Sequence, residues 1–81
     1  MTDTQTNLSI EKQVYSIVED LKEYIHLPND RNRLAYCLYK YVNGEGDVPE
    51  ILVKSTKINF TGITEKELAS KLNEALKTVK K

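Results

Sequence analysis

The fold is decided by residues 10–25, which read IEKQVYSIVEDLKEYI. Apolar side chains recur there at three- and four-residue spacing and share one narrow arc of a helical wheel. They are Ile10, Val14, Ile17, Val18, Leu21, Tyr24 and Ile25. Ser9 can cap the first free amides, and Pro28 disfavours helical geometry at the residue before it. The pattern predicts an amphipathic helix over about residues 9–27, with a flexible polar tail, residues 1–8, in front of it.

A second amphipathic stretch follows after a short joint. Asn29 or Asp30 can cap its start, and Asn43 followed by Gly44 is typical of a helix end. The apolar face between them consists of Leu34, Ala35, Cys37, Leu38, Tyr41 and Val42. We expect a helix over about residues 30–43 that packs against the first as an antiparallel neighbour, because short joints favour that arrangement.

A third amphipathic helix is expected over about residues 64–80. Thr64 and Glu67 have the spacing of a capping box, in which each side chain binds the backbone amide of the other residue. The apolar arc consists of Leu68, Ala69, Leu72, Ala75, Leu76 and Val79. The C-terminal end of this helix carries positive charge, which the helix dipole favours there. The charge lies on Lys77, Lys80 and Lys81.

Residues 48–60 allow two interpretations. Asp47 and Glu50 have capping-box spacing and Pro49 suits a first turn, which favours a short helix over about residues 48–55 and an extended link after it. The β-branched residues of this segment would also suit a strand, which would need a second chain to pair its edge. The expected fold class is mainly α: a small bundle of three amphipathic helices plus a short helix or extended segment, in a single helical domain, residues 9–81.

Length and charge limit the function classes. A chain of 81 residues has room for one small core, so a homodimer would help to cover its apolar surface. Twelve acidic and twelve basic side chains cancel, but residues 1–50 carry a net charge of −4 and residues 51–81 a net charge of +4. A single cysteine, no signal-peptide pattern and no apolar run of about 20 residues predict a cytoplasmic protein without membrane insertion.

The sequence offers no catalytic constellation. His26 is the only histidine and is expected at the surface, and Cys37 is expected to behave as a small, partly buried hydrophobe. Residues 43–47, Asn-Gly-Glu-Gly-Asp, match neither a phosphate-binding loop nor an EF-hand, and are interpreted as a solvated turn. We expect no enzymatic activity, no metal, no cofactor and no small-molecule substrate.

The most suggestive cluster lies on the outer face of the second helix. Arginine, lysine and tyrosine together can bind phosphate, stack on bases or anchor a protein interface. Tyrosine rings that cover a thin core with their hydroxyls in water would explain the same residues. The candidate binding residues are Arg31, Arg33, Tyr36, Tyr39 and Lys40, together with the C-terminal Lys77, Lys80 and Lys81.

The C-terminal segment carries one family resemblance. Thr64-Glu65-Lys66-Glu67-Leu68-Ala69, then Leu72-Asn73 and finally Lys77-Thr78-Val79-Lys80-Lys81 resemble the start of the helix-turn-helix of bacterial regulators. The resemblance puts Ala69 at the tight-packing position and Asn73 at the turn, and it implies a second helix that reads the DNA major groove. Glu74 departs from the pattern, because an apolar turn residue is expected there. One uninterrupted amphipathic helix would account for the same residues.

These observations predict a small cytoplasmic interaction or regulatory protein of bacterial or mobile-element origin. It would bind a macromolecule through helix faces, with a protein partner or a second copy of itself favoured. The first alternative is a nucleic-acid-binding regulator that uses Arg31, Arg33, Lys40 and the C-terminal lysines. The second is a bacteriocin-immunity type of protein, since those are also small helical bundles.

Overall fold

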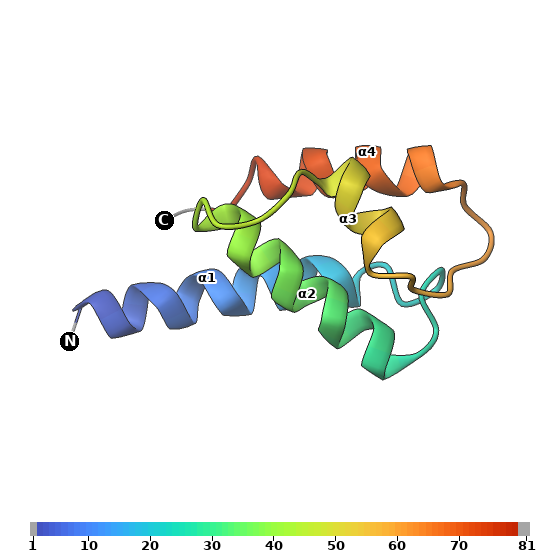
Figure 1. The fold of residues 1–81 in the computed structure, drawn as a ribbon. Coiled ribbons are helices and arrows are strands. Elements are labelled where there is room, and N and C mark those ends of the chain that lie inside the picture. Colours follow the sequence, from blue (N-terminus) through green and yellow to red (C-terminus); the bar gives the residue numbers. More distant parts are fainter. Residues whose placement is uncertain (1, 80–81) are drawn as a thin grey trace.

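The computed structural model describes residues 2–79, with side chains from residue 9 onward, as four helices (Figure 1). They are α1 (Thr2–Glu19), α2 (Pro28–Val42), α3 (Pro49–Ser55) and α4 (Glu65–Leu76), and no strand occurs within residues 2–79. The predicted mainly α bundle is confirmed. The ambiguous segment is a short helix followed by an extended link, which is the interpretation that the sequence favoured.

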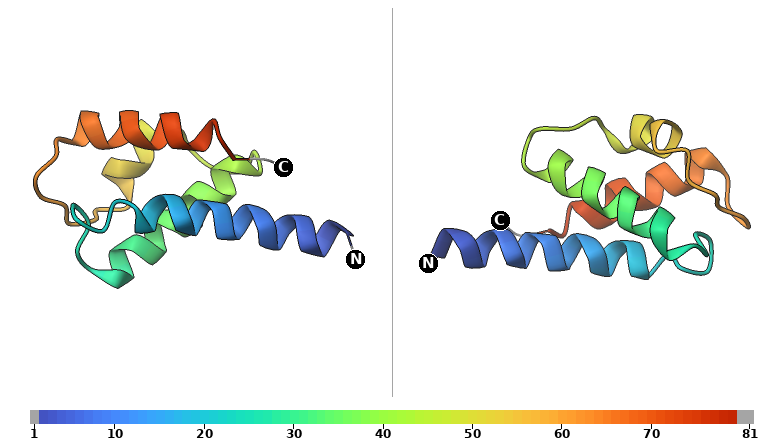
Figure 2. Two further views of the ribbon diagram at one scale, coloured as in Figure 1. Left: turned by 180° about the vertical axis from the view of Figure 1, so that it is seen from behind. Right: turned by 60° about the horizontal axis from the view of Figure 1, so that its bottom comes forward.

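The helices form two pairs. Figure 1 shows α2 running back across α1, as predicted for antiparallel neighbours, while α4 runs along the opposite side of the molecule. The short α3 packs against α4 and also contacts α2. Figure 2 shows the segments before α2 and before α4 together at one end, and the two chain termini toward the other.

The core lies between the two pairs and draws side chains from all four helices. Each fully buried apolar side chain contributes on the order of 1.5–3 kcal/mol relative to an exposed one. The fully buried apolar residues include Val14 and Val18 of α1, Leu34 and Leu38 of α2, Val53 of α3, Leu68 and Leu72 of α4, and Ile25 from the segment between α1 and α2.

The bounds predicted for the first helix are wrong at both ends. The helical backbone begins at Thr2, and Ser9 lies inside α1, where its hydroxyl oxygen accepts from the side-chain Nε2 of Gln13 at 3.5 Å rather than capping the helix. No proline or glycine interrupts residues 2–8, so the helix can extend through them. Met1 lies outside the described residues, and the mobility of the expected tail stays a prediction.

At its other end α1 stops eight residues before the expected Leu27. The following residues form turns closed by bonds from the Leu21 amide to the Val18 carbonyl at 3.0 Å and from the Tyr24 amide to the Leu21 carbonyl at 2.9 Å. The helical pattern of apolar residues therefore continues beyond the helix, because the turns still direct Leu21 and Ile25 into the core.

The predicted caps of α2 and α3 are also wrong. Leu27 occupies the capping position of α2 without a side-chain bond, and Pro28 takes the first helical position, where its missing amide hydrogen costs nothing. Val48 begins α3 in the same way. Glu50 does not close a capping box with Asp47, and its carboxylate accepts from the side-chain Nδ2 of Asn73 on α4 at 2.8 Å.

The capping box of α4 is confirmed, but its predicted C-terminal end is not. The helix ends at Leu76, and the Thr78 hydroxyl donates to the Ala75 carbonyl at 2.6 Å and tightens the last turn. Lys80 and Lys81, which were included in the prediction, lie outside the described residues. Asn73 lies within uninterrupted helix, so the turn that the helix-turn-helix resemblance implies there is absent.

Three hydrogen bonds join the two helix pairs at one end of the molecule. The Thr61 amide donates to the Tyr24 carbonyl at 2.9 Å, and the Thr61 hydroxyl lies 3.1 Å from His26 Nε2. The Asn59 amide donates to Asp30 Oδ2 at 3.1 Å. We call these three bonds the clasp, since they connect the segment between α1 and α2 and the first turn of α2 to the link between α3 and α4.

Candidate functional site

The outer face of α2 carries an exposed aromatic ring between two cations. Tyr36 is 60% exposed, the largest value among the exposed large hydrophobic side chains of the described residues. Lys40 Nζ lies 5.6 Å from the centroid of its ring, which is within the range of a cation–π contact. Arg33 lies one turn earlier with its side chain 56% exposed. These three residues, Arg33, Tyr36 and Lys40, are called the α2 stripe below.

Arg33 is held in place by a buried carboxylate. Its Nη2 donates to Asp30 Oδ1 at 2.6 Å, and Asp30 is only 6% exposed. The other oxygen of Asp30 takes part in the clasp by accepting from the Asn59 amide. One edge of the guanidinium is therefore fixed while the rest of the side chain stays in water, which lowers the entropy that Arg33 would lose on binding a partner.

Arg31, predicted to belong to the same binding face, is turned toward the protein. Its Nη1 donates to the Ile25 carbonyl at 2.8 Å and to the His26 carbonyl at 3.0 Å. Its Nε lies 3.5 Å from Glu19 Oε1, and its side chain is 16% exposed. Arg31 thus satisfies carbonyl groups that the turns after α1 leave open. The sequence did not distinguish Arg31 from Arg33, because both fall at the start of α2.

The remaining predicted site residues do not join the α2 stripe. Tyr39 is half-buried and packs against the core. Lys77 lies just after α4 with its side chain 72% exposed, 3.4 Å from Glu74 Oε1, and so exposed an ion pair contributes little. Lys80 and Lys81 lie outside the described residues. The structure therefore brings together three of the eight predicted residues on one open face.

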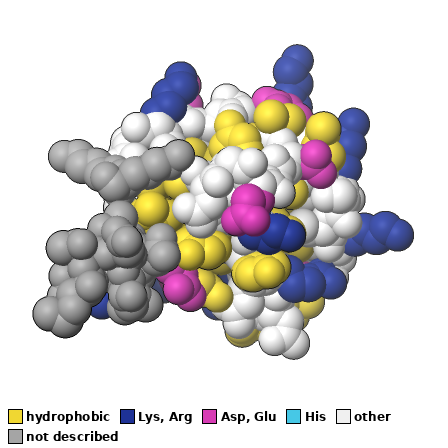
Figure 3. All heavy atoms as spheres, turned by 60° about the vertical axis from the view of Figure 1, so that its left-hand side comes forward, with side chains coloured by type: hydrophobic (Ala, Val, Ile, Leu, Met, Phe, Trp, Pro, Cys, Tyr) yellow, Lys and Arg dark blue, Asp and Glu magenta, His cyan; other side chains and the backbone are white. Residues whose placement is uncertain are grey.

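Apolar side chains also reach the surface at the end of the bundle near the chain termini. Figure 3 shows them there between acidic and basic side chains. A hollow of about 390 Å³ lies where α2 and α4 end. Its lining includes Tyr41, Val42, Leu76, Lys77 and Val79.

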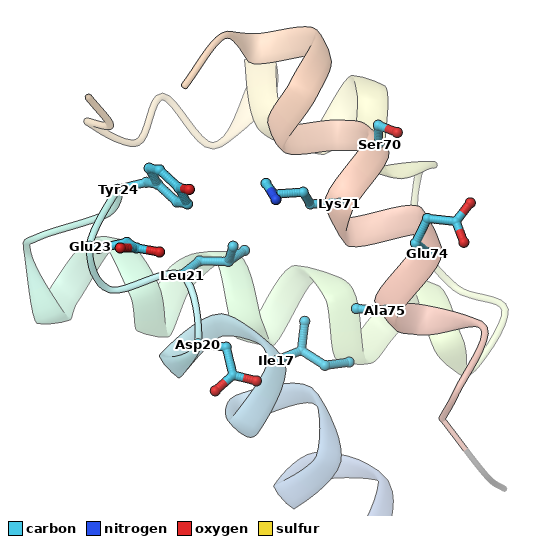
Figure 4. A pocket seen from close by; sticks show the side chains of 9 residues that line it. All are labelled: Ile17, Asp20, Leu21, Glu23, Tyr24, Ser70, Lys71, Glu74 and Ala75. Carbon is cyan, nitrogen blue, oxygen red and sulfur yellow. The ribbon is translucent and has the colours of Figure 1, made fainter. Parts of the chain in front are cut away.

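Sequence reasoning missed a groove between the end of α1 and α4. The groove has a volume of about 590 Å³. Figure 4 shows the side chains that line it, which are Ile17, Asp20, Leu21, Glu23, Tyr24, Ser70, Lys71, Glu74 and Ala75. The spacing of apolar residues in the sequence places the apolar residues of the groove on one face. It does not predict that α4 lies far enough from α1 to leave this face partly exposed.

The two residues considered for catalysis lie apart from any reactive arrangement among the described residues. His26 contacts the Thr61 hydroxyl, and Cys37 is half-buried against the core. No group of three or more histidine, cysteine or acidic side chains that could hold a metal occurs in the part of the chain that the structure describes. The pKa of Glu67 is lowered because the Thr64 backbone amide and then the Thr64 hydroxyl donate hydrogen bonds to its carboxylate, which reflects helix capping.

Comparisons of the chain with protein-family models, with curated proteins and with solved structures find no match. Of the helices that the structure describes, none has the length and apolar character needed to cross a membrane.

Proposed function

We propose that the protein is a small, non-enzymatic interaction protein of the cytoplasm that binds an acidic protein surface through the α2 stripe. The observation that carries the proposal is the ring of Tyr36, 60% exposed with the Lys40 ammonium 5.6 Å from its centroid. Tyrosine and arginine, together with tryptophan, are enriched among the residues that dominate binding energy at protein interfaces. An aromatic ring left in water beside two cations is suited to a partner that offers carboxylates around an apolar contact.

The charges of the stripe favour a protein over a nucleic acid. Within the stripe, Arg33 and Lys40 supply the positive charge, and Arg33 already shares its charge with Asp30. Nucleic-acid-binding proteins typically neutralise several phosphates, and each contact adds to the salt dependence of the affinity. Two cations suffice for a few charge-assisted bonds at an interface between proteins.

The test is affinity capture with matched tyrosine variants. Tyr36→Ala should lose a partner that the wild-type protein captures from a lysate of its source organism, whereas Tyr15→Ala should retain it. Tyr15 is the matched control because it is an exposed tyrosine on a different helix, at 37% exposure. The purified partner should then bind Tyr36→Ala at least tenfold more weakly, as expected for a central interface tyrosine. Equal binding by both variants would exclude the stripe as the interface.

Single-stranded nucleic acid is a second candidate, supported by the cation–π pair itself. Aromatic rings beside cations are the elements on which bases stack in such complexes. Fluorescence anisotropy with a labelled oligonucleotide would show binding that weakens steeply with salt and on Arg33→Glu. Undetectable binding at low salt would remove this candidate.

A further inference from the structure

The groove between α1 and α4 has an apolar floor. Ile17 lies on α1 and Leu21 and Tyr24 on the turns that follow it, while Ala75 lies on α4 (Figure 4). Ile17, Tyr24 and Ala75 keep part of their surface open although they face the core side of the bundle. The end of one helix and the side of another thus form two walls with apolar surface between them, which is the arrangement that accepts an amphipathic helix.

Acidic side chains dominate the rim. Asp20 and Glu23 stand at the wall formed by the end of α1, and Glu74 stands at the α4 wall, where Lys77 already lies 3.4 Å from its carboxylate. All three are exposed, and Lys71 is the single basic residue among those that line the groove. The local charge is therefore opposite to that of the α2 stripe.

Lys71 is a basic side chain that lies in this groove. Figure 4 shows its side chain extending from α4 across the groove toward Tyr24, with Glu23 beside the ring. The aliphatic stem of a lysine can lie on apolar surface while the ammonium stays near carboxylates. A segment that supplied a lysine or arginine there could lay its aliphatic stem on the same apolar surface and hold its charge near Glu23.

We propose that this groove binds a cationic amphipathic helical segment of a partner protein, with its apolar side chains on Ile17, Leu21 and Tyr24 and its lysines or arginines at Asp20 and Glu23. The groove also continues along α1, because a neighbouring hollow of about 410 Å³ shares Ile17 and Asp20, and there Lys12 adds a second basic side chain at the far end. From Lys12 to Asp20 this wall spans about 12 Å at 1.5 Å per residue, enough for two turns of a docked helix.

The test uses two synthetic helical peptides with the same leucine face, one flanked by lysines and the other by glutamates. Nuclear magnetic resonance titration should show the lysine peptide shifting the amides of Ile17, Leu21, Tyr24 and Ala75. The glutamate peptide should shift them at least tenfold less strongly at the same concentration, because the rim repels it. Equal shifts from the two peptides would overturn the proposed charge selection.

Charge-removing variants test which part of the surface binds the lysine peptide. The double variant Asp20→Asn, Glu23→Gln should weaken binding of the lysine peptide about fivefold to tenfold. The matched control is the double variant Asp47→Asn, Glu45→Gln, which removes the same charge from the exposed loop before α3 and should change the affinity less than twofold. If the two double variants bind alike, the acidic rim does not hold the peptide.

Two further substitutions separate the apolar contribution to peptide binding from the electrostatic contribution. Ser70→Trp places a bulky ring into the groove from an exposed position and should abolish binding while the circular dichroism of the bundle is unchanged. Lys71→Ala removes the competing cation and should strengthen binding about threefold. Weaker binding by Lys71→Ala, or full binding by Ser70→Trp, would overturn the proposal.

A second copy of the chain is the alternative occupant. If the groove amides shift with protein concentration alone and the lysine peptide has no effect, the groove is a self-association surface and the proposed partner is wrong. Binding of the lysine peptide to the groove should not depend on the α2 stripe, so Tyr36→Ala should bind this peptide with wild-type affinity.

Discussion

The first turns of α2 and α4 begin with similar sequence signals and are stabilised in different ways. Thr64 and Glu67 close a capping box at α4, with the Glu67 amide donating to the Thr64 hydroxyl at 3.1 Å and the Thr64 amide donating to Glu67 Oε1 at 3.1 Å. At α2 the candidate caps Asn29 and Asp30 leave the helix start without a side-chain bond. Asp30 instead accepts from the distant Asn59 amide.

The difference shows when a capping pattern in the sequence leads to a capping hydrogen bond in the structure. Thr64 and Glu67 are exposed, and no other described element competes for their oxygens, so the local interaction forms. Asp30 is buried at the meeting point of two segments, where an unpaired amide would cost more than an uncapped helix start. Pro28 also reduces the need for a cap, because it removes one of the free amides of the first turn.

The largest effect in this comparison is expected at Asp30. Asp30→Ala leaves the Asn59 amide and the Arg33 guanidinium without their acceptor, and should lower the free energy of unfolding by about 3 kcal/mol. Urea denaturation followed by circular dichroism measures the loss. Asp30→Asn, which keeps one carbonyl acceptor, should lose about half as much. A loss below about 0.5 kcal/mol for the alanine variant would show that the clasp does not depend on this carboxylate.

Arg31 should rank second. Arg31→Ala removes two charge-assisted hydrogen bonds, to the Ile25 and His26 carbonyls, and should lower the free energy of unfolding by about 2 kcal/mol. Arg33→Ala is the neighbouring control and should lose about 1 kcal/mol, because the lost guanidinium is half exposed and the buried Asp30 carboxylate keeps its bond from the Asn59 amide. If the order of the two arginine variants were reversed, our distinction between an inward and an outward arginine at α2 would be wrong.

The capping box of α4 should contribute less than either residue. Thr64→Ala removes the acceptor for the Glu67 amide and should cost about 1 kcal/mol in the same denaturation experiment. Asn29→Ala at the start of α2 should cost less than about 0.3 kcal/mol, since Asn29 does not cap that helix. Equal losses for the two variants would remove the contrast between the two helix starts.

The smallest effect is a pH dependence specific to α4. The hydrogen bonds from Thr64 hold the pKa of Glu67 below its ordinary value in the folded protein. A lowered folded pKa means that the carboxylate contributes stability fully above its unfolded pKa, and loses it as the pH falls through the folded pKa. The stability difference between the wild-type protein and Glu67→Gln should therefore be present at neutral pH and disappear in acid. A difference that stays constant with pH would show that the charge of Glu67 has no part in the cap.

The sequence predicted those parts of the fold that depend on neighbours along the chain. The period of the apolar residues in α1, α2 and α4 is a local property, and so is the capping box at Thr64. The end of α1 could not be predicted in this way. The helix stops at Glu19, and beyond it the carbonyls of Ile25, His26 and Tyr24 accept from Arg31 and the Thr61 amide, in contacts that exist only after the helices have packed.

The candidate binding residues show the same difference between features set by neighbours along the chain and features set by packing. Arg33, Tyr36 and Lys40 share a helix face at fixed spacing, so the sequence alone placed them together. Arg31 looked equivalent, but its direction is set by carbonyls of another segment. The groove could not be predicted from the sequence, because its walls belong to segments about fifty residues apart. The space between these walls depends on how the two helix pairs pack against each other.

The clasp also determines the order in which the chain can assemble. Its bonds join residues 29 positions apart at Asp30 and Asn59 and 35 positions apart at His26 and Thr61, so each closes a long loop of chain. Closing such loops costs entropy before any contact repays it, whereas α1 with α2 and α3 with α4 can meet across short connections. Each helix pair should thus form early, and the clasp should join the pairs late, so that weakening the clasp accelerates unfolding and leaves the folding rate nearly unchanged. Stopped-flow kinetics of Asp30→Ala would contradict this order if the substitution slowed folding instead.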